Sequence, residues 1–272
     1  MNIDAAVISH ESAIRLVFFA AIFAAISVAE YLMPRRVLTA PRQKRWMNNL
    51  LLVLTGTVLT RVIFPLLPVG VALFCARKHF GFLNFYHFPP WMAFVCGVVL
   101  LDLTIYLQHM MFHLTPFLWR MHKVHHIDHD IDVTTGLRFH PLEIILSMMI
   151  KIFAIAVTGA PAASVVVFEI LLNGVSMFNH GNMNIPRAAD SLIRLLIVTP
   201  DMHRVHHSII RDETNSNYGF NYSWWDRIFG TYREAPEGGH ERMKIGLAGY
   251  HDLKYLRFLP MLMVPFKTGR ES

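Results

Sequence analysis

The sequence predicts an all-α integral membrane protein, with about three single membrane spans, a helical hairpin and a cytoplasmic helical cap. Three observations support this fold class. Of the 272 residues, 54% are hydrophobic and 16% are charged, whereas about a quarter are charged in an ordinary soluble domain. Apolar runs of bilayer-spanning length recur along the chain. Seven of the 16 histidines lie between residues 109 and 140, and three more lie between residues 203 and 207.

Residues 12–33 supply the first span, because a helix that crosses a bilayer needs roughly 20 apolar residues. The chain start lacks the basic region and cleavage site of a signal peptide, so we expect this segment to remain as an anchor. The positive-inside rule predicts that the short basic loop after it is cytoplasmic and that the N-terminus lies outside. This loop contains Arg35, Arg36, Arg42, Lys44 and Arg45.

Residues 47–76 are apolar but too long for one straight crossing, about 45 Å against a hydrocarbon core of about 30 Å. Pro65 and Pro68 divide them into a span that ends near residue 64 and a kinked or interfacial piece that stays on the far side. The third span, residues 91–112, crosses back. It therefore brings the histidines at its end to the cytoplasmic face.

Residues 142–160 and 161–178 are two further apolar segments, separated by Gly159-Ala160-Pro161. They predict a helical hairpin that enters the membrane and returns to the histidine side at Asn179-His180-Gly181-Asn182. An amphipathic stretch at 188–198 should lie on the membrane surface. Residues 199–272 then form the cytoplasmic cap.

The net charge of +6 does not indicate a nucleic-acid partner, because the basic residues stand in short clusters beside apolar segments. Membrane orientation explains this pattern better. The two cysteines, Cys75 and Cys96, lie within apolar runs and show no metal-ligand spacing. We expect both to be small buried apolar side chains.

The histidines have the spacing of one helix face. Positions three or four residues apart on a helix point the same way, so each of three groups can aim its imidazoles at one point. Solvated interfacial histidines, or a patch that titrates near pH 6.5, would not require this spacing three times. The three groups are His109 and His113; His122, His125 and His126; and His203, His206 and His207.

Eight or more nitrogens exceed what one tetrahedral ion binds, so two metal ions are implied. Imidazole suits iron, copper and zinc alike, and none of the three histidine groups belongs to a Glu-x-x-His motif of the kind that soluble di-iron bundles use. His129 stays open between solvent, a positioning role and a metal ligand. The acids near the histidines would either orient imidazole N–H groups or be solvated loop residues. These acids are Asp128, Asp130, Asp132 and Asp201.

Together these motifs resemble the fatty acid hydroxylase/sterol desaturase superfamily. The resemblance covers roughly residues 95–235 and rests on motifs that are specific in combination. They are His109-x-x-x-His113, His122-x-x-His125-His126, Arg138-Phe139-His140-Pro141-Leu142-Glu143, Asn179-His180-Gly181-Asn182, His203-x-x-His206-His207, Asn217-Tyr218-Gly219, Trp225-Asp226 and Phe229-Gly230-Thr231-Tyr232.

The resemblance implies a membrane-bound oxygenase with a non-haem centre of two Fe ions, which uses O2 to hydroxylate or desaturate a sterol, fatty acyl or alkyl lipid. It makes His140 either a ligand or a residue that acts with Glu143 to position one. Glu143, Asp132 and Asp201 are likewise possible ligands or positioning residues. The ligands it implies are His109, His113, His122, His125, His126, His203, His206 and His207, with His180 as a ninth.

The resemblance also implies a division into membrane spans at 1–94, a catalytic domain at 95–235 and a tail at 236–272. Because the sequence has no flavin, nucleotide or iron–sulfur motif, we expect a separate electron donor of the ferredoxin or cytochrome type. We expect a multi-pass protein of the bacterial inner membrane with its histidine site cytoplasmic. A membrane metal-binding or metal-transport protein is the alternative, although transport ligands would be expected at the membrane midplane.

Overall fold

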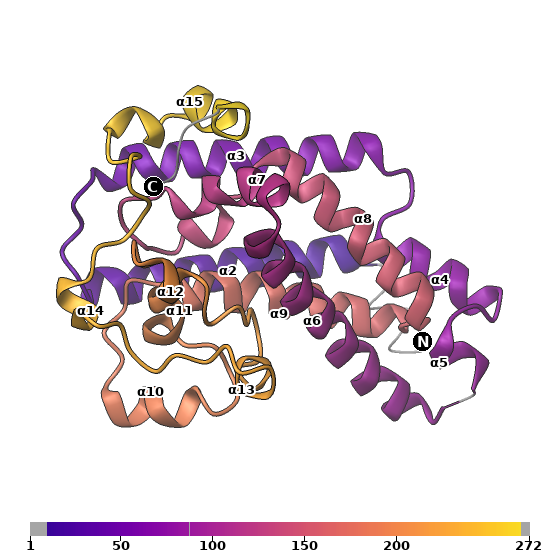
Figure 1. Ribbon diagram of the computed structural model, residues 1–272. Coiled ribbons are helices and arrows are strands. Elements are labelled where there is room, and N and C mark those ends of the chain that lie inside the picture. The colour runs from indigo at the N-terminus through magenta and orange to yellow at the C-terminus, as the bar shows by residue number, and fades with distance from the viewer. Residues whose placement is uncertain (1–9, 87, 268–272) are drawn as a thin grey trace.

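The computed structural model describes residues 10–86 and 88–267, and the regular secondary structure of this part of the chain is helical apart from isolated β-bridges (Figure 1). Five of its helical segments are long and apolar enough to cross a membrane. The predicted all-α membrane fold is therefore confirmed. The long helices are α2 (Glu11–Leu32), α3 (Arg42–Ile63), α6 (Pro90–Leu114), α8 (Pro141–Thr158) and α9 (Ala162–Asn179), and α4 (Pro68–Arg77) and α5 (Phe82–Phe85) follow α3.

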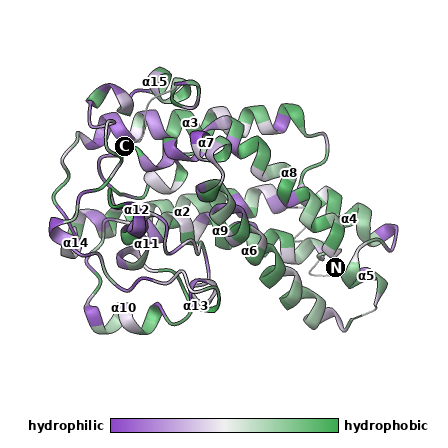
Figure 2. Ribbon diagram, viewed as in Figure 1, coloured by the Kyte–Doolittle hydropathy of each residue, from purple (hydrophilic) through white to green (hydrophobic). Residues whose placement is uncertain are grey.

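Helix α9 is the most buried of the five long helices. Half of the most apolar window of α9 is buried, against 6% of the corresponding window of α2. Helix α9 packs against α2, α6 and α4, while α8 packs against α3, α6 and α4. Figure 2 shows the apolar residues along these helices and the polar residues concentrated at the end that carries the cap. The apolar outer surfaces of the helices are thus available to lipid.

The predicted hairpin is present but splayed. Helix α8 ends at Gly159, whose φ of 69° is the left-handed conformation common after the last helical turn, and α9 begins after Pro161. Instead of packing on each other along their lengths, α8 and α9 both pack on α6 and α4. The space between them becomes part of the cavity described below.

The prediction that Arg35 to Arg45 form one basic loop is wrong at the C-terminal end of that segment. Helix α3 begins at Arg42, so Arg42, Lys44 and Arg45 are its first turn. Arg45 is completely buried because Asp128 and Asp132 pair with its guanidinium group. The predicted division at the prolines is confirmed, since α3 ends at Ile63 and α4 begins at Pro68.

The cap consists of short elements. The stretch predicted as a surface helix forms α10, with Leu192, Leu195 and Leu196 exposed in and just after it. The last segment folds back over α3 and α7, where Met261 and Val264 pack with Leu52. The elements are α7 (Pro116–His126), η1 (Thr135–Leu137), α10 (Arg187–Ile193), α11 (Pro200–His206), α12 (Arg211–Thr214), α13 (Trp224–Ile228), α14 (Gly239–Arg242), η2 (Leu253–Leu256), α15 (Phe258–Met263) and η3 (Val264–Phe266).

Candidate metal centre

Three helix boundaries bring the histidines together. Helix α6 ends at Leu114 and α7 begins at Pro116, so the chain turns and the α7 histidines face those of α6. Helix α11 begins at Pro200, and the Thr199 side chain caps it by accepting a hydrogen bond from the amide of Met202. These caps set where the His203–His207 segment enters the site.

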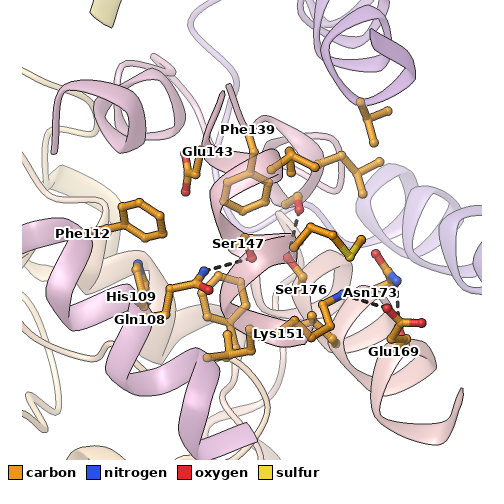
Figure 3. Close-up of a pocket in the computed structure, with 18 of the residues that line it drawn as sticks. Gln108, His109, Phe112, Phe139, Glu143, Ser147, Lys151, Glu169, Asn173 and Ser176 are labelled. Carbon is orange, nitrogen blue, oxygen red and sulfur yellow. Dashed lines mark hydrogen bonds and ion pairs between the residues drawn. The ribbon is translucent and has the colours of Figure 1, made fainter. Parts of the chain in front are cut away.

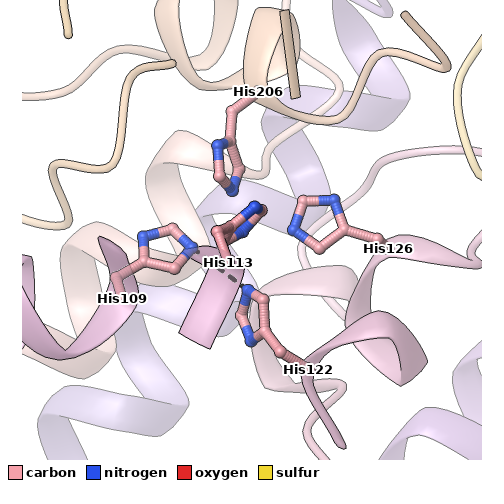
Figure 4. A group of neighbouring side chains, drawn as sticks. All are labelled: His109, His113, His122, His126 and His206. Atoms are coloured by element: carbon pink, nitrogen blue, oxygen red, sulfur yellow. Dashed lines mark hydrogen bonds between the residues drawn. The ribbon is translucent and has the colours of Figure 1, made fainter. Parts of the chain in front are cut away.

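Nine histidines form two groups, in each of which the possible ligand atoms lie within 4.8 Å of one another. Figure 4 shows the first group, with rings from α6, α7 and α11 around a common centre. The second group combines histidines of α7 and α11 with His180, which follows α9. The first group is His109, His113, His122, His126 and His206, and the second is His125, His180, His203 and His207.

The hydrogen bonds of the first group leave nitrogen lone pairs facing one another. His109 donates through Nδ1 to the carbonyl oxygen of Tyr218 at 2.7 Å, and His122 donates through Nδ1 to Glu143 Oε1 at 2.6 Å. A neutral imidazole has one donor and one acceptor nitrogen, so both Nε2 atoms carry lone pairs. They lie 3.1 Å apart, an arrangement that a cation between them would stabilise.

In the second group, three imidazoles converge on His180. Its Nδ1 donates to the Ser176 carbonyl at 2.7 Å, so its Nε2 carries a lone pair. The Nε2 atoms of His125 and His203 lie 3.1 Å from it and that of His207 lies 3.2 Å from it. Two nitrogens that bind one ion tetrahedrally at about 2.1 Å are about 3.4 Å apart, so this donor set fits a metal ion.

Burial keeps these imidazoles neutral. It lowers the pKa of His122, His125 and His126 well below the ordinary 6.5, and it lowers that of His180 to about 3. The pKa values of the three α11-segment histidines are lowered well below 6.5 for the same reason. Metal coordination requires the neutral ring, so the folded chain presents these histidines in the form that binds.

The partners that hold the rings are mostly backbone carbonyls. Besides Tyr218 and Ser176, the Ser216 carbonyl accepts from His206 Nδ1 at 2.7 Å. Sequence reasoning missed these groups, because any residue type supplies a carbonyl. The Asn217-Tyr218-Gly219 motif was the available signal, and Asn217 fixes that segment by donating to the Met202 and Arg233 carbonyls.

Glu143 lies against a ring of the first group, as its hydrogen bond to His122 shows, whereas His140 and His129 lie outside both groups. His140 precedes α8 and accepts from the amide of Leu142, and its Nε2 lies 3.2 Å from the Leu262 carbonyl. His129 lies 2.8 Å from the Tyr250 carbonyl. Both histidines therefore contact backbone groups and do not belong to the candidate centre.

The acids considered as partners of imidazoles instead bind arginines and backbone amides. Asp128 and Asp132 pair with Arg45, and Asp130 accepts from the amides of Thr39 and Ala40. Asp201 pairs with Arg35 and Arg204. Asp128, Asp130 and Asp132 are buried, so they are not solvated loop acids either. Arginine is the stronger partner because two N–H groups can meet one carboxylate.

A cavity of about 230 Å³ adjoins the first histidine group (Figure 3). His109, His122 and Glu143 line one end together with three phenylalanines, and Lys151 and Glu169 line the other. Met148 also lines the cavity, whereas Met149 is exposed and Phe178 packs beside Val133 and Met177. A lipid segment inside this cavity would touch the candidate metal centre.

The fatty acid hydroxylase family model matches residues 94–231, which contain all nine histidines. The chain belongs to the fatty acid hydroxylase family. It is 28% identical to an ornithine lipid hydroxylase of Rhizobium tropici over 257 residues, which are 92% of this chain and 75% of that protein. It is 30% identical to the alkylglycerol monooxygenase of Homo sapiens over 157 residues, 58% of this chain and 33% of that protein. No solved structure matches the chain.

A further relative, the cholesterol 25-hydroxylase of Rattus norvegicus, is 24% identical over 51% of this chain and 46% of its own length. These family members are hydroxylases and monooxygenases, so the chain is a membrane-bound oxidoreductase of that kind, acting on a lipid. The metal-transport alternative has no support from the relatives named here. The alkylglycerol and cholesterol enzymes share about half of the chain, whereas the likeness to the ornithine lipid enzyme extends over nearly all of it.

Proposed function

We propose that the two histidine groups bind two iron ions and that the chain hydroxylates a membrane lipid with O2 and electrons from a separate donor. The observation that carries the proposal is the opposed lone pairs of His109 and His122, with a second set of imidazoles converging on His180, beside a cavity of about 230 Å³. Neutral, buried acceptor nitrogens with no other use are what a cation site provides.

The first group would hold one iron through His109, His113, His122, His126 and His206. The second would hold the other through His125, His180, His203 and His207. When bound, iron supplies the oxidant for an unactivated C–H bond, which side chains alone cannot supply. The protein holds the rings through Glu143 and the backbone carbonyls, and it excludes water by burying both groups.

We propose hydroxylation rather than desaturation, and an acylated polar lipid as the substrate class. A relative that aligns with 92% of the chain is named for the hydroxylation of an ornithine lipid. The cavity begins at the candidate centre and continues between α8 and α9 to Arg15 of α2, so the substrate would enter from the bilayer. We place the centre at the cytoplasmic face of a bacterial inner membrane, where a ferredoxin or cytochrome donor would dock.

Metal analysis tests this proposal directly. The full chain, produced in iron-rich medium and purified in mild detergent, should contain two irons per chain, with the Mössbauer spectrum of a coupled pair. The His206→Ala and His125→Ala variants should each lose iron, because they remove ligands from the first and second groups respectively. Oxidation of added bacterial lipids, followed by mass spectrometry, should disappear in both.

His251→Ala and His10→Ala are the matched controls, since both side chains are exposed and outside the two groups. They should retain iron and turnover. Zinc in place of iron after iron-rich growth, with no O2-dependent lipid product, would contradict the proposal. So would full iron content in the His125→Ala and His206→Ala variants.

A further inference from the structure

A polar track leads away from the candidate centre within the membrane-spanning helices. Glu143, Ser147 and Lys151 are spaced four residues apart on α8, so they lie on one face, and all three line the cavity. Eight residues separate Glu143 from Lys151, about 12 Å along the helix and less than half of a hydrocarbon core of about 30 Å. Figure 3 shows these side chains along one wall.

The far end of the track is an ion cluster. Lys151 Nζ lies 2.7 Å from Glu169 Oε1, and the other Glu169 oxygen lies 2.9 Å from Arg15. Lys151 is 9% exposed and Glu169 1%. Charged residues within spans are costly and therefore rare, and they commonly mark a ligand path.

The cluster and the track have hydrogen-bonding capacity to spare. A lysine ammonium has three N–H donors, and Glu169 takes one of them. Gln108 donates to Ser147, but its own Oε1 has no partner among the described residues although the residue is 8% exposed. If these ion pairs served only to hold α2, α8 and α9 together, neither an adjoining cavity nor unpaired hydrogen-bonding groups would be needed.

We propose that Lys151 binds a carbonyl or carboxylate oxygen of the lipid substrate and thereby decides which carbon faces His109 and His122. This inference rests on the proposed function, since it assigns that enzyme its substrate contact. Glu169 positions the ammonium group, and the oxygen occupies the donors that Glu169 leaves free. The same contact disfavours pure hydrocarbons, which would leave those donors unpaired.

Binding of three twelve-carbon probes tests the contact without turnover. Lauric acid and methyl laurate carry the oxygen, and dodecane lacks it. In Lys151→Met, which keeps the length but loses the donors, we expect oxygenated probes to bind about tenfold more weakly or worse, as for a lost hydrogen bond to a charged group. Dodecane binding should be unchanged. Weaker binding of lauric acid alone would identify a free carboxylate as the group that Lys151 binds. Weaker binding of both oxygenated probes would identify an acyl carbonyl.

The paired variant Lys151→Met with Glu169→Gln leaves no unmatched buried carboxylate and should show the same selective loss. Lys78→Met, an exposed lysine outside the cavity, is the control and should bind all three probes normally. Infrared spectra of carbonyl-¹³C methyl laurate on the unmodified chain add a readout that needs no variant. The carbonyl band should move to lower wavenumber on binding.

An unshifted band, or equal losses for methyl laurate and dodecane, would overturn the inference. The outcome is separable from that of the proposed function. A chain with two irons and an unshifted carbonyl band would contradict this contact alone. A shifted band in a chain without iron would retain the contact and contradict the di-iron proposal.

Discussion

The Nδ1 proton of each ring decides which nitrogen is available to a metal. In His109, His180 and His206 a backbone carbonyl holds that proton, so side-chain substitutions leave the contact in place. His122 is different because its partner is the side chain of Glu143. The first group can therefore be tested at a residue that is not itself a proposed ligand.

Glu143→Ala should weaken iron binding in the first group by about ten- to a hundredfold, the usual effect of removing a partner that orients a histidine ligand. Glu143→Gln keeps an oxygen that can accept the His122 proton, so its loss should be smaller. Iron retained against a graded chelator measures both. Equal retention in the two variants and the unmodified chain would show that His122 needs no such partner.

At the level of elements, buried ion pairs fix the segment between α7 and α8. Arg45 of α3 binds Asp128 and Asp132, and Arg138 donates to the Val124 carbonyl and to Asn49. The two arginines hold the pKa of Asp128 well below its ordinary value. Helix α3 contributes Arg45, and α7 contributes three proposed ligands, two in the first group and one in the second. This network therefore sets the position of the site on the spans.

Arg45→Met should lower the free energy of unfolding by about 3–5 kcal/mol, because it leaves buried carboxylates without their counter-charge. Thermal unfolding in detergent, followed by circular dichroism, provides the measurement. Arg211→Met is the matched control, because Arg211 is exposed in the cap, and it should change stability little. A similar small effect for Arg45→Met would mean that the network does not stabilise the fold.

Gly136 of η1 packs directly on α9. An added Cβ would lie 2.5 Å from the Ser176 carbonyl oxygen and 3.1 Å from His180 Nδ1. Gly136→Ala should therefore displace the hydrogen bond that orients His180, destabilise the fold by about 1–3 kcal/mol and reduce iron in the second group. Gly70→Ala meets only Leu66 at 3.4 Å or more and should be neutral. Unfolding temperature and iron content, compared between the two variants, test this.

Helical spacing predicted correctly that His109 and His113 share one group, because that information is local. The prediction that each of the other two sets aims at a single point is wrong, since both sets divide between the two groups. His125 and His126 are adjacent in sequence, yet they belong to different groups because neighbouring side chains on a helix point about 100° apart. The roles of Asp128 and Asp132 were also unpredictable, since their partner Arg45 is more than 80 residues away.

For the whole molecule, hydropathy predicted the spans and the prolines predicted the break after α3. The splay of α8 from α9 could not be predicted, because it depends on α6 and α4 packing between them. The cavity and the ion cluster of Arg15, Lys151 and Glu169 follow from this splay. In the sequence these three charged residues stand far apart, each within an apolar run, so nothing local indicates that they meet.

Membrane orientation is a prediction for the whole molecule. The positive-inside rule places the cap in the cytoplasm and the loop after α4 outside. In spheroplasts, an impermeant maleimide should label Lys78→Cys but label Arg211→Cys only after lysis, both made in a chain without Cys75 and Cys96. Both Lys78 and Arg211 are exposed, so reactivity reports the side of the membrane. The reverse labelling pattern would place the histidine site outside.

The opposed imidazole lone pairs also affect how much of the protein accumulates in the membrane. Without a cation, the acceptor nitrogens of His109 and His122, 3.1 Å apart, repel one another within a dry interior, and bound metal adds its binding free energy to that of folding. Newly made chains that find no iron should therefore remain open around α7 and α11 and be degraded. Iron scarcity would then reduce the amount of the protein in the membrane, and the surviving molecules would each be fully loaded.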